Sequence, residues 1–265
     1  MLESERSVIF DLDGTIYQNT VFHTDYIHAL VANTPFTDWE QDLISLADDV
    51  FAGRLLHMNR FYRPGALHAH SCAELIDGLA GQLCPPISYE EAMGKDDLLY
   101  LGDAWSVMDL LGLGLGCLDK KRSDELYRQI RRQMEQKGMQ GSPRLRQAII
   151  DLQKRTRAVL VSNSYRQTVD EFLRQLGFSG IFQTVCCSAR KPYGMIESLR
   201  KTDPNLLQDP QNLISIGDHA FNDLMPIAAL GGETVWMNPY SGIDPPVCDR
   251  SFSTLAELAD YLDTI

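Results

Sequence analysis

The stretch VIFDLDGTIYQN, residues 8–19, places two aspartates directly behind a short apolar run. The apolar run predicts a buried β-strand over residues 7–10. Asp11 and Asp13 come at the end of that strand, and a glycine and Thr15 follow them in a segment typical of a turn. Ligands of open parallel sheets bind at the carboxyl ends of the strands, so both carboxylates are candidate functional groups.

Four more β-like runs lie far along the chain, with helix-like segments between consecutive members. The runs occupy residues 158–162, 184–188, 213–217 and 234–237, and the helices are expected at Tyr165–Leu176, Tyr193–Lys201 and Asn222–Ala229. The C-terminal stretch STLAELADYLDTI predicts a closing helix. Strands that alternate with helices predict an α/β fold, a Rossmann-like parallel sheet covered by helices on both faces.

Over a hundred residues without a convincing strand separate the first run from the second. Apolar periodicity predicts helices there at Phe22–Ala32, Trp39–Phe51, Cys72–Leu83, Ala104–Leu111 and Ser123–Gln136. We therefore predict a core made of residues 1–18 and 143–265, interrupted by an all-helical domain at residues 19–142. Ser142 would cap the helix that begins at Pro143. GLGLG at 112–116 follows a helical pattern, and we interpret it as a flexible element of this domain.

The composition limits the possible partners and the cellular compartment. A net charge of -12 and a pI near 4.9 disfavour a nucleic-acid partner, because both molecules would be anionic. No apolar run has the length of a membrane-spanning helix, and the acidic N-terminus does not resemble a secretory leader. The six cysteines include no C-x-x-C pair, so we expect reduced thiols and a cytoplasmic protein. The oligomeric state is not predicted.

Further polar residues follow the later strands, and parallel topology should bring them to the same edge as the first two aspartates. They are Ser162 and Asn163 after the second run, Lys191 after the third, and Asp218 and Asp223 in SIGDHAFND after the fourth. Crowded carboxylates repel one another unless a cation neutralises them, and oxygen ligands suit Mg²⁺. We therefore expect a magnesium site.

The segments DLDGT, VLVSNS, KP and GDHAFND resemble, in order and placement, the four-motif signature of the haloacid dehalogenase-like (HAD) superfamily. The helical insert is similar to the first-type cap of that family. The resemblance covers the core, about half of the chain, and it is most specific in the first and fourth motifs. It implies a HAD fold in which Asp11 is the nucleophile that attacks phosphorus and Asp13 is the acid that protonates the leaving oxygen.

The resemblance also implies the roles of the other residues. Mg²⁺ would be held by Asp11, the backbone carbonyl of Asp13 and Asp218, with Asp223 orienting this set. Ser162 and Lys191 would complete the catalytic groups. Thr15 and the amide N–H of Asn163 would contact the phosphoryl group.

These roles predict a Mg²⁺-dependent phosphatase that acts on a small phosphorylated metabolite through an aspartyl phosphate. Members that cleave carbon–halogen bonds resemble the pattern without an acid at position 13, so Asp13 favours phosphoryl transfer. A phosphomutase of the same superfamily and a catalytically silent binding protein remain alternatives. Nucleotide, phosphoglycolate-type and sugar phosphates are all open as substrates.

A basic stretch between residues 50 and 73 contains Arg54, Arg60 and Arg63 but no acidic residue. One hypothesis is that one of these arginines contacts the anionic substrate. The alternative is that they are solvated or paired with acids elsewhere in the chain.

Overall fold

The chain forms two compact units in the computed structural model, which describes residues 6–18, 22–240 and 242–265. The sheet unit comprises Met1–Asn19, Lys137–Pro239 and Pro245–Ile265, and the helical unit comprises Thr20–Gln136 and Tyr240–Asp244. The predicted domain boundary after residue 18 adjoins residues 19–21, which lie outside the described residues. The domain limits drawn from the sequence therefore stay a prediction.

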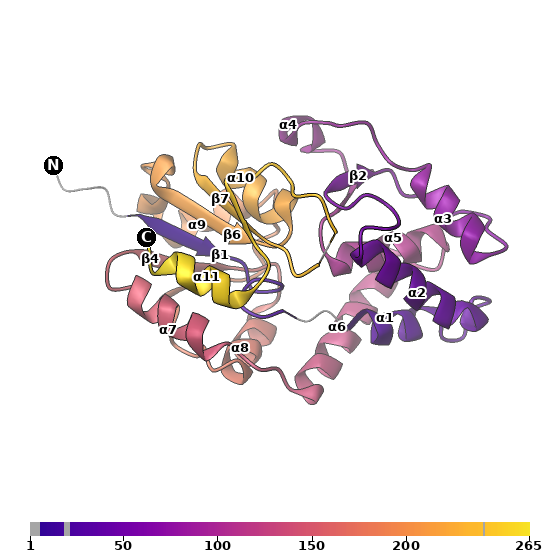
Figure 1. Cartoon of the computed structure of the whole chain (residues 1–265), viewed down its shortest axis with the longest axis horizontal. Coiled ribbons are helices and arrows are strands. Elements are labelled where there is room, and N and C mark those ends of the chain that lie inside the picture. Colours follow the sequence, from indigo (N-terminus) through magenta and orange to yellow (C-terminus); the bar gives the residue numbers. More distant parts are fainter. Residues whose placement is uncertain (1–5, 19–21, 241) are drawn as a thin grey trace. The chain divides into compact units, whose positions relative to one another are not determined.

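A six-stranded parallel sheet in the order β5, β4, β1, β6, β7, β8 forms the centre of the sheet unit (Figure 1). The strands are β1 (Ser7–Phe10), β4 (Arg157–Val161), β5 (Thr184–Cys186), β6 (Leu213–Gly217), β7 (Glu233–Met237) and β8 (Arg250–Phe252). The α/β class is thus confirmed. The edge strand β8 was not predicted, because its three residues carry no apolar run that would distinguish them from a loop.

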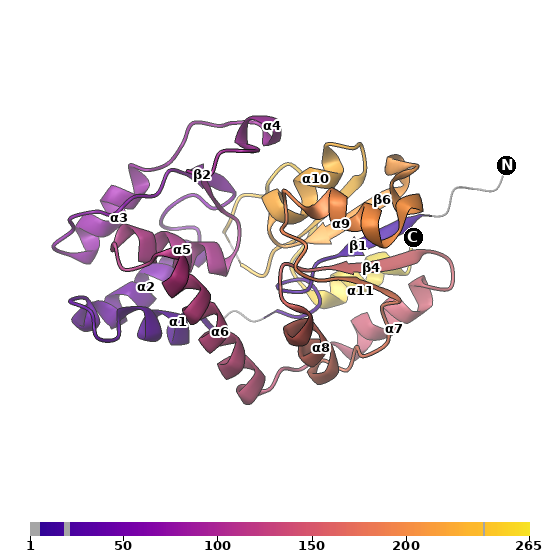
Figure 2. The ribbon, with the colours of Figure 1, turned by 180° about the vertical axis from the view of Figure 1, so that it is seen from behind.

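Helices cover both faces of this sheet, as Figures 1 and 2 show from opposite sides, with α7 and α11 on one face and α9 and α10 on the other. Their bounds are α7 (Pro143–Leu152), α8 (Arg166–Gln175), α9 (Met195–Thr202), α10 (Met225–Ala228) and α11 (Leu255–Leu262). Short 3₁₀ turns occupy Pro204–Leu207 and Pro210–Asn212, and a π-helical turn occupies Ala220–Leu224.

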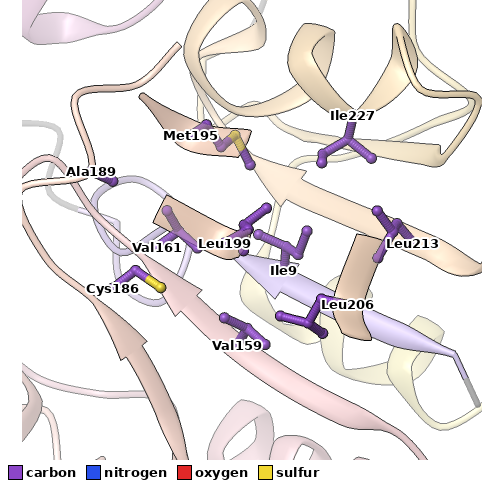
Figure 3. Packing of buried hydrophobic residues seen from close by; sticks show 10 residues of the cluster. All are labelled: Ile9, Val159, Val161, Cys186, Ala189, Met195, Leu199, Leu206, Leu213 and Ile227. Atoms are coloured by element: carbon purple, nitrogen blue, oxygen red, sulfur yellow. The ribbon is translucent and has the colours of Figure 1, made fainter. Parts of the chain in front are cut away.

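One face of the sheet is packed by a cluster of buried apolar side chains (Figure 3). Ile9 of β1 and Val159 of β4 contribute from the sheet, and Leu199 of α9 and Ile227 of α10 contribute from the helices. Burial of a side chain of this size stabilises a protein by roughly 1.5 to 3 kcal/mol. This packing holds the central strands, whose ends carry the polar residues of interest.

The helical unit contains α1 (Phe22–Val31), α2 (Glu40–Phe51), α3 (Cys72–Ala80), α4 (Tyr89–Ala92), α5 (Ala104–Gly114) and α6 (Lys120–Lys137), with a 3₁₀ turn at Thr37–Trp39. It differs from the all-helical prediction in one respect. An antiparallel pair of short strands, β2 (Arg60–Tyr62) and β3 (Leu99–Leu101), lies within it. Strands of three residues are too short to give the period-two pattern by which a strand is recognised in sequence.

The first three residues of the GLGLG run form the closely packed end of α5, so its interpretation as a flexible element was wrong for this part. Gly112 and Gly114 lie within α5 and are buried. A Cβ added to Gly112 would come within 2.8 Å of Leu118, and one added to Gly114 would come within 2.7 Å of Leu79. The glycines therefore allow neighbouring side chains to approach the helix.

Within the described part of the chain, none of the helices combines the length and apolarity needed to cross a membrane.

Candidate active site

Three adjacent strands bring the first group of polar residues together. The backbone N–H of Asp11 donates to the carbonyl of Ile216 at 2.9 Å, which extends the pairing of β1 with β6 by one residue. The N–H of Ser162 donates in the same way to Cys186 of β5 at 2.9 Å. Asp218 follows the last residue of β6. The sheet order β4, β1, β6 therefore places these residues at one edge of the sheet unit.

Lys191 connects two of the predicted acidic residues. Its Nζ donates to Asp11 Oδ1 at 2.5 Å and to Asp223 Oδ1 at 2.6 Å. All three side chains are at least nine-tenths buried. Burial acts to lower the pKa of Lys191, but the charges of Asp11 and Asp223 outweigh it and raise that pKa above the usual lysine value. Lys191 is therefore a fixed cation.

Asp11 lies in an environment that resists ionisation in the absence of further positive charge. Burial raises the pKa of Asp11 to about 8, and the charges of Asp223 and Asp13 add to this effect, while Lys191 opposes it. One ammonium group does not balance this concentration of carboxylates. A further cation near Asp11 would favour its ionised form.

The loop after β6 fixes Asp223 and Asp218 in place. Asp223 Oδ2 accepts a hydrogen bond from the N–H of His219 at 3.0 Å, and Trp236 of β7 donates from Nε1 to the carbonyl of Asp218 at 2.8 Å. The residue before Asp218 must be small, because a Cβ on Gly217 would come within 2.4 Å of Asp223 Oδ2. Asp223 thus orients both Lys191 and the backbone of its own loop.

Gly14 makes room for Asp218 on the opposite side. Its φ of +71° belongs to the left-handed region that glycine adopts readily. A Cβ at this position would lie 2.0 Å from Asp218 Oδ2. Both the backbone conformation and the space beside Asp218 therefore require glycine.

The donor atoms fit a hard divalent cation. Asp11, Asp218 and Asp223 each offer a carboxylate oxygen, and these oxygens lie within 4.8 Å of one another. An all-oxygen set of this kind suits Mg²⁺, which typically takes one or two carboxylates and completes its shell with water or phosphate. The Asp13 carboxylate is outside this group; the sequence prediction involved its backbone carbonyl.

Asp13 has a different environment from Asp11. The hydroxyl of Tyr17 donates to Asp13 Oδ1, and the Ser164 hydroxyl lies 3.5 Å from Asp13 Oδ2. Asp13 is half-buried. The two acids that follow β1 therefore have different hydrogen-bond partners. Asp11 faces an ammonium group, and Asp13 faces two hydroxyls.

The residues after β4 hold the loop that carries Lys191. The side-chain oxygen of Asn163 accepts from the N–H of Lys191 at 2.6 Å, and its Nδ2 donates to the Lys191 carbonyl at 3.2 Å. Ser162 Oγ accepts from the N–H of Ser164 at 3.1 Å and can still donate its own proton. Ser188 and Arg190, in the same loop as Lys191, have φ values of 51° and 54°.

Thr15 is fully buried, and its Oγ1 has no hydrogen-bond partner within the described ranges. A buried hydroxyl without a partner is costly in a folded protein, so the site has an unused donor and acceptor next to the aspartates.

The three predicted substrate-binding arginines belong to the helical unit. Arg54 forms an ion pair with Asp49, and Arg63 pairs with Asp97 at 2.5 Å. Arg60 begins β2, opposite Leu101 of β3. Two of the three arginines are thus paired with an acidic residue. A substrate contact by any of the three arginines stays a prediction.

Four residues at the site were not singled out in the sequence, namely Tyr17, Ser164, His219 and Trp236. Tyr17 lies in the stretch VIFDLDGTIYQN and Ser164 lies in the segment VLVSNS, so their positions gave a signal that was not used. His219 contributes a backbone N–H, which has no signature in a sequence. Trp236 comes from a different strand, and only the order of the sheet reveals its contact with Asp218.

Comparison with known proteins identifies a family for this chain. A protein-family model described as haloacid dehalogenase-like hydrolase matches residues 5–231. A search of curated proteins finds no significant match.

Several solved structures have a similar fold at low sequence identity, which supports the fold alone. YfnB from Bacillus subtilis, assigned as a HAD-hydrolase and solved with bound magnesium, has a TM-score of 0.56 and 18% identity, covering 98% of this chain and 100% of that one. A Haemophilus somnus protein assigned as a phosphoglycolate phosphatase has a TM-score of 0.55 and 13% identity, covering 98% and 99%. A Thermotoga maritima protein assigned as a β-phosphoglucomutase has a TM-score of 0.51 and 13% identity, covering 98% and 99%.

Proposed function

Since the chain belongs to the haloacid dehalogenase-like hydrolase family, we propose that it is a Mg²⁺-dependent phosphatase that hydrolyses a small phosphorylated metabolite. Asp11 is the nucleophile, and Asp13 is the general acid and base. The proposal includes a cytoplasmic location. Its partner is a small molecule rather than a nucleic acid or a membrane. The location and the kind of partner stay predictions from composition.

The reaction has two steps that use the two acids differently. In the first, an oxygen of Asp11 forms a bond to phosphorus while the bond to the leaving oxygen breaks, and Asp13 gives its proton to that oxygen. In the second, Asp13 takes a proton from water, the water oxygen bonds to phosphorus, and the bond to Asp11 breaks. Lys191 keeps Asp11 oriented and favours its ionised form.

Asp11, Asp218 and Asp223 are the side chains available to hold Mg²⁺. When bound, the ion supplies positive charge that offsets the carboxylates and the phosphoryl oxygens. Ser162, through its hydroxyl, and Thr15, with its unpartnered Oγ1, are available to donate to the phosphoryl group. The side chain of Asn163 is occupied with Lys191, so its expected contact would use its backbone N–H.

The observation that carries this proposal is the pair of acids behind β1 in two distinct environments. Asp11 contacts a cation, as a nucleophile that must be ionised requires, and Asp13 contacts hydroxyls, as a group that must exchange a proton requires. A dehalogenase of this family would not need the second acid. A silent binding protein would not need either.

A phosphomutase remains the alternative, because phosphoryl transfer to a second hydroxyl would use the same groups. A structural neighbour assigned as a β-phosphoglucomutase has this fold. Analysis of the products separates the two activities, since a mutase gives an isomeric phosphate ester and a phosphatase gives inorganic phosphate.

The test is phosphate release from sugar phosphates, nucleoside monophosphates and two- and three-carbon phosphoacids, with Mg²⁺ or with EDTA. We expect turnover of at least one class with Mg²⁺, and loss of turnover both with EDTA and in Asp11→Asn. Asp38→Asn, a change of the same kind at an exposed position, should retain full activity. A correctly folded protein that releases no phosphate from any of these compounds would contradict the proposal.

A further inference from the structure

Tyr17 is brought next to Asp13 by the turn that follows β1. The N–H of Ile16 donates to the carbonyl of Leu12 at 3.0 Å, and Asp13 and Tyr17 form an isolated bridge. The backbone therefore returns alongside Asp13 four residues later. From this position the Tyr17 hydroxyl donates a hydrogen bond to Asp13 Oδ1.

The ring of Tyr17 is held by packing. Tyr17 is only 4% exposed, and its ring lies edge-on to that of Phe172 in α8, with 5.6 Å between the centroids and an angle of 80°. Phe172 itself is fully buried. A packed aromatic ring has few rotatable bonds, so its hydroxyl is a fixed donor rather than an adaptable one.

Ser164 approaches the other oxygen of the same carboxylate. Its hydroxyl lies 3.5 Å from Asp13 Oδ2, and Ser164 is buried. The backbone of Ser164 is fixed by bonds from its N–H to Ser162 Oγ and from the N–H of Ser188 to its carbonyl. The 3.5 Å contact is long, so it is weaker than the hydrogen bond from Tyr17.

We propose that Tyr17 is a positioning residue that orients Asp13 for proton transfer. The inference rests on the proposed function. In this role the neutral Asp13 carboxyl donates its O–H proton, and the hydrogen bond from Tyr17 holds the carboxyl in one orientation. In the first step this O–H bond breaks and a new O–H bond forms on the leaving oxygen. In the second step a proton from water restores it.

This role predicts an effect that depends on the basicity of the leaving group. Phenolate needs a proton as it departs, whereas p-nitrophenolate is stable as an anion and needs little help. Loss of the Tyr17 hydroxyl should therefore impair cleavage of phenyl phosphate more than cleavage of p-nitrophenyl phosphate. A merely structural role for Tyr17 would affect both esters equally.

The experiment measures kcat/KM of Tyr17→Phe with phenyl phosphate and p-nitrophenyl phosphate in the presence of Mg²⁺, because kcat/KM reports the step in which the leaving group departs, whereas the second step is the same for both esters. General acid catalysis contributes typically about 100- to 10,000-fold, so misorientation of the acid should lower kcat/KM for phenyl phosphate by about 10-fold or more. We expect a much smaller loss of kcat/KM for p-nitrophenyl phosphate. Asp13→Asn should show the same selectivity with a larger loss.

Two further variants keep the test decisive. Tyr261→Phe removes a comparable tyrosine–carboxylate hydrogen bond, 2.8 Å from the hydroxyl to Glu233, and should leave both reactions unchanged. Ser164→Ala should show the selectivity of Tyr17→Phe with a smaller loss, and it serves as the second probe if Tyr17→Phe has a lowered melting temperature.

The outcomes separate this inference from the proposed function. Equal losses of kcat/KM with both esters, or no loss with either, in Tyr17→Phe would overturn the role of Tyr17 and leave the phosphatase proposal intact. If the wild-type protein released phosphate from neither ester nor from any compound of the metabolite panel, the proposed function and this inference would both be overturned.

Discussion

Asp109 is a titratable residue of the helical unit that the proposed chemistry does not use. It lies on α5, where the Tyr26 hydroxyl donates to its Oδ1 at 3.4 Å and the Ser123 hydroxyl lies 3.5 Å from the same oxygen. Burial raises the pKa of Asp109 to about 7; the charge of Asp103 adds to this, and the two hydroxyls oppose it. Above that pH the folded protein carries an ionised carboxylate with weak partners.

We predict that Asp109→Asn is more stable relative to the wild-type protein at pH 8 than it is at pH 5. The folded-state pKa near 7 exceeds the usual aspartate value of about 3.9, so the folded state binds more protons and stability falls as the pH rises between these values. The variant lacks this loss, which is on the order of 2 kcal/mol after solvent screening. Thermal melting at pH 5 and pH 8 measures it.

Asp38→Asn provides the control for this comparison, because Asp38 is exposed. Its melting temperature should follow that of the wild-type protein at both pH values. If Asp109→Asn also follows the wild-type protein at both, the carboxylate is ionised in the folded state throughout this range and the prediction is wrong.

At the scale of elements, helix termini are stabilised by the side chains that the sequence placed there. Ser142 precedes α7, its Oγ accepts from the N–H of Leu145 at 3.2 Å, and Pro143 occupies the first helical position. This confirms the predicted cap. An N-cap side chain pairs with one of the backbone N–H groups that a helix leaves without partners at its start.

Ser142→Ala should lower the free energy of unfolding by about 1 kcal/mol, because the N–H of Leu145 loses its acceptor. Ser142→Asp should retain the wild-type value, since aspartate caps helices well and its charge is favourable at a helix N-terminus. Urea denaturation followed by circular dichroism gives both values. An unchanged midpoint in Ser142→Ala would show that the cap contributes nothing.

The loop between β5 and α9 shows why an element cannot be understood from its own residues. Lys191 extends from this loop to Asp11 and Asp223, while Asn163, from the loop after β4, bonds both the N–H and the carbonyl of Lys191. The lysine is therefore positioned by a residue 28 positions away in sequence. Pairing of β4 with β5 brings the two loops together.

At the scale of the whole molecule, the candidate metal site exists only when the sheet is assembled. Asp11 follows β1, and Asp218 and Asp223 follow β6, so more than two hundred residues of chain separate Asp11 from the other two acids. An ion that binds this folded arrangement and not the unfolded chain must stabilise the fold.

Mg²⁺ is therefore expected to raise the melting temperature of the wild-type protein. The stabilisation should be about 1.4 to 2.7 kcal/mol when Mg²⁺ exceeds its Kd by roughly ten- to a hundredfold. Asp218→Asn should abolish most of this increase, and Asp38→Asn should preserve it. Differential scanning fluorimetry with Mg²⁺ or EDTA makes the comparison, and an increase of equal size in all three proteins would indicate binding elsewhere.

The sequence alone determined the α/β class, the helical nature of the insert and the identity of the principal acids. These follow from local properties, because hydrophobic periodicity reports which face of an element is buried, and short motifs at strand ends report residues that parallel topology will gather. Asp11, Lys191 and Asp223 were named in this way, and their side chains are in contact.

Only the tertiary structure decided how those residues are held and which others join them. The Asn163 contacts with Lys191, the Tyr17 bond to Asp13 and the Trp236 bond to Asp218 depend on the order of strands and on turn geometry. The strands β2 and β3 pair across nearly forty residues with no periodic signal of their own. The physical reason is that non-local contacts form between chain segments brought together by packing, and no local pattern records them.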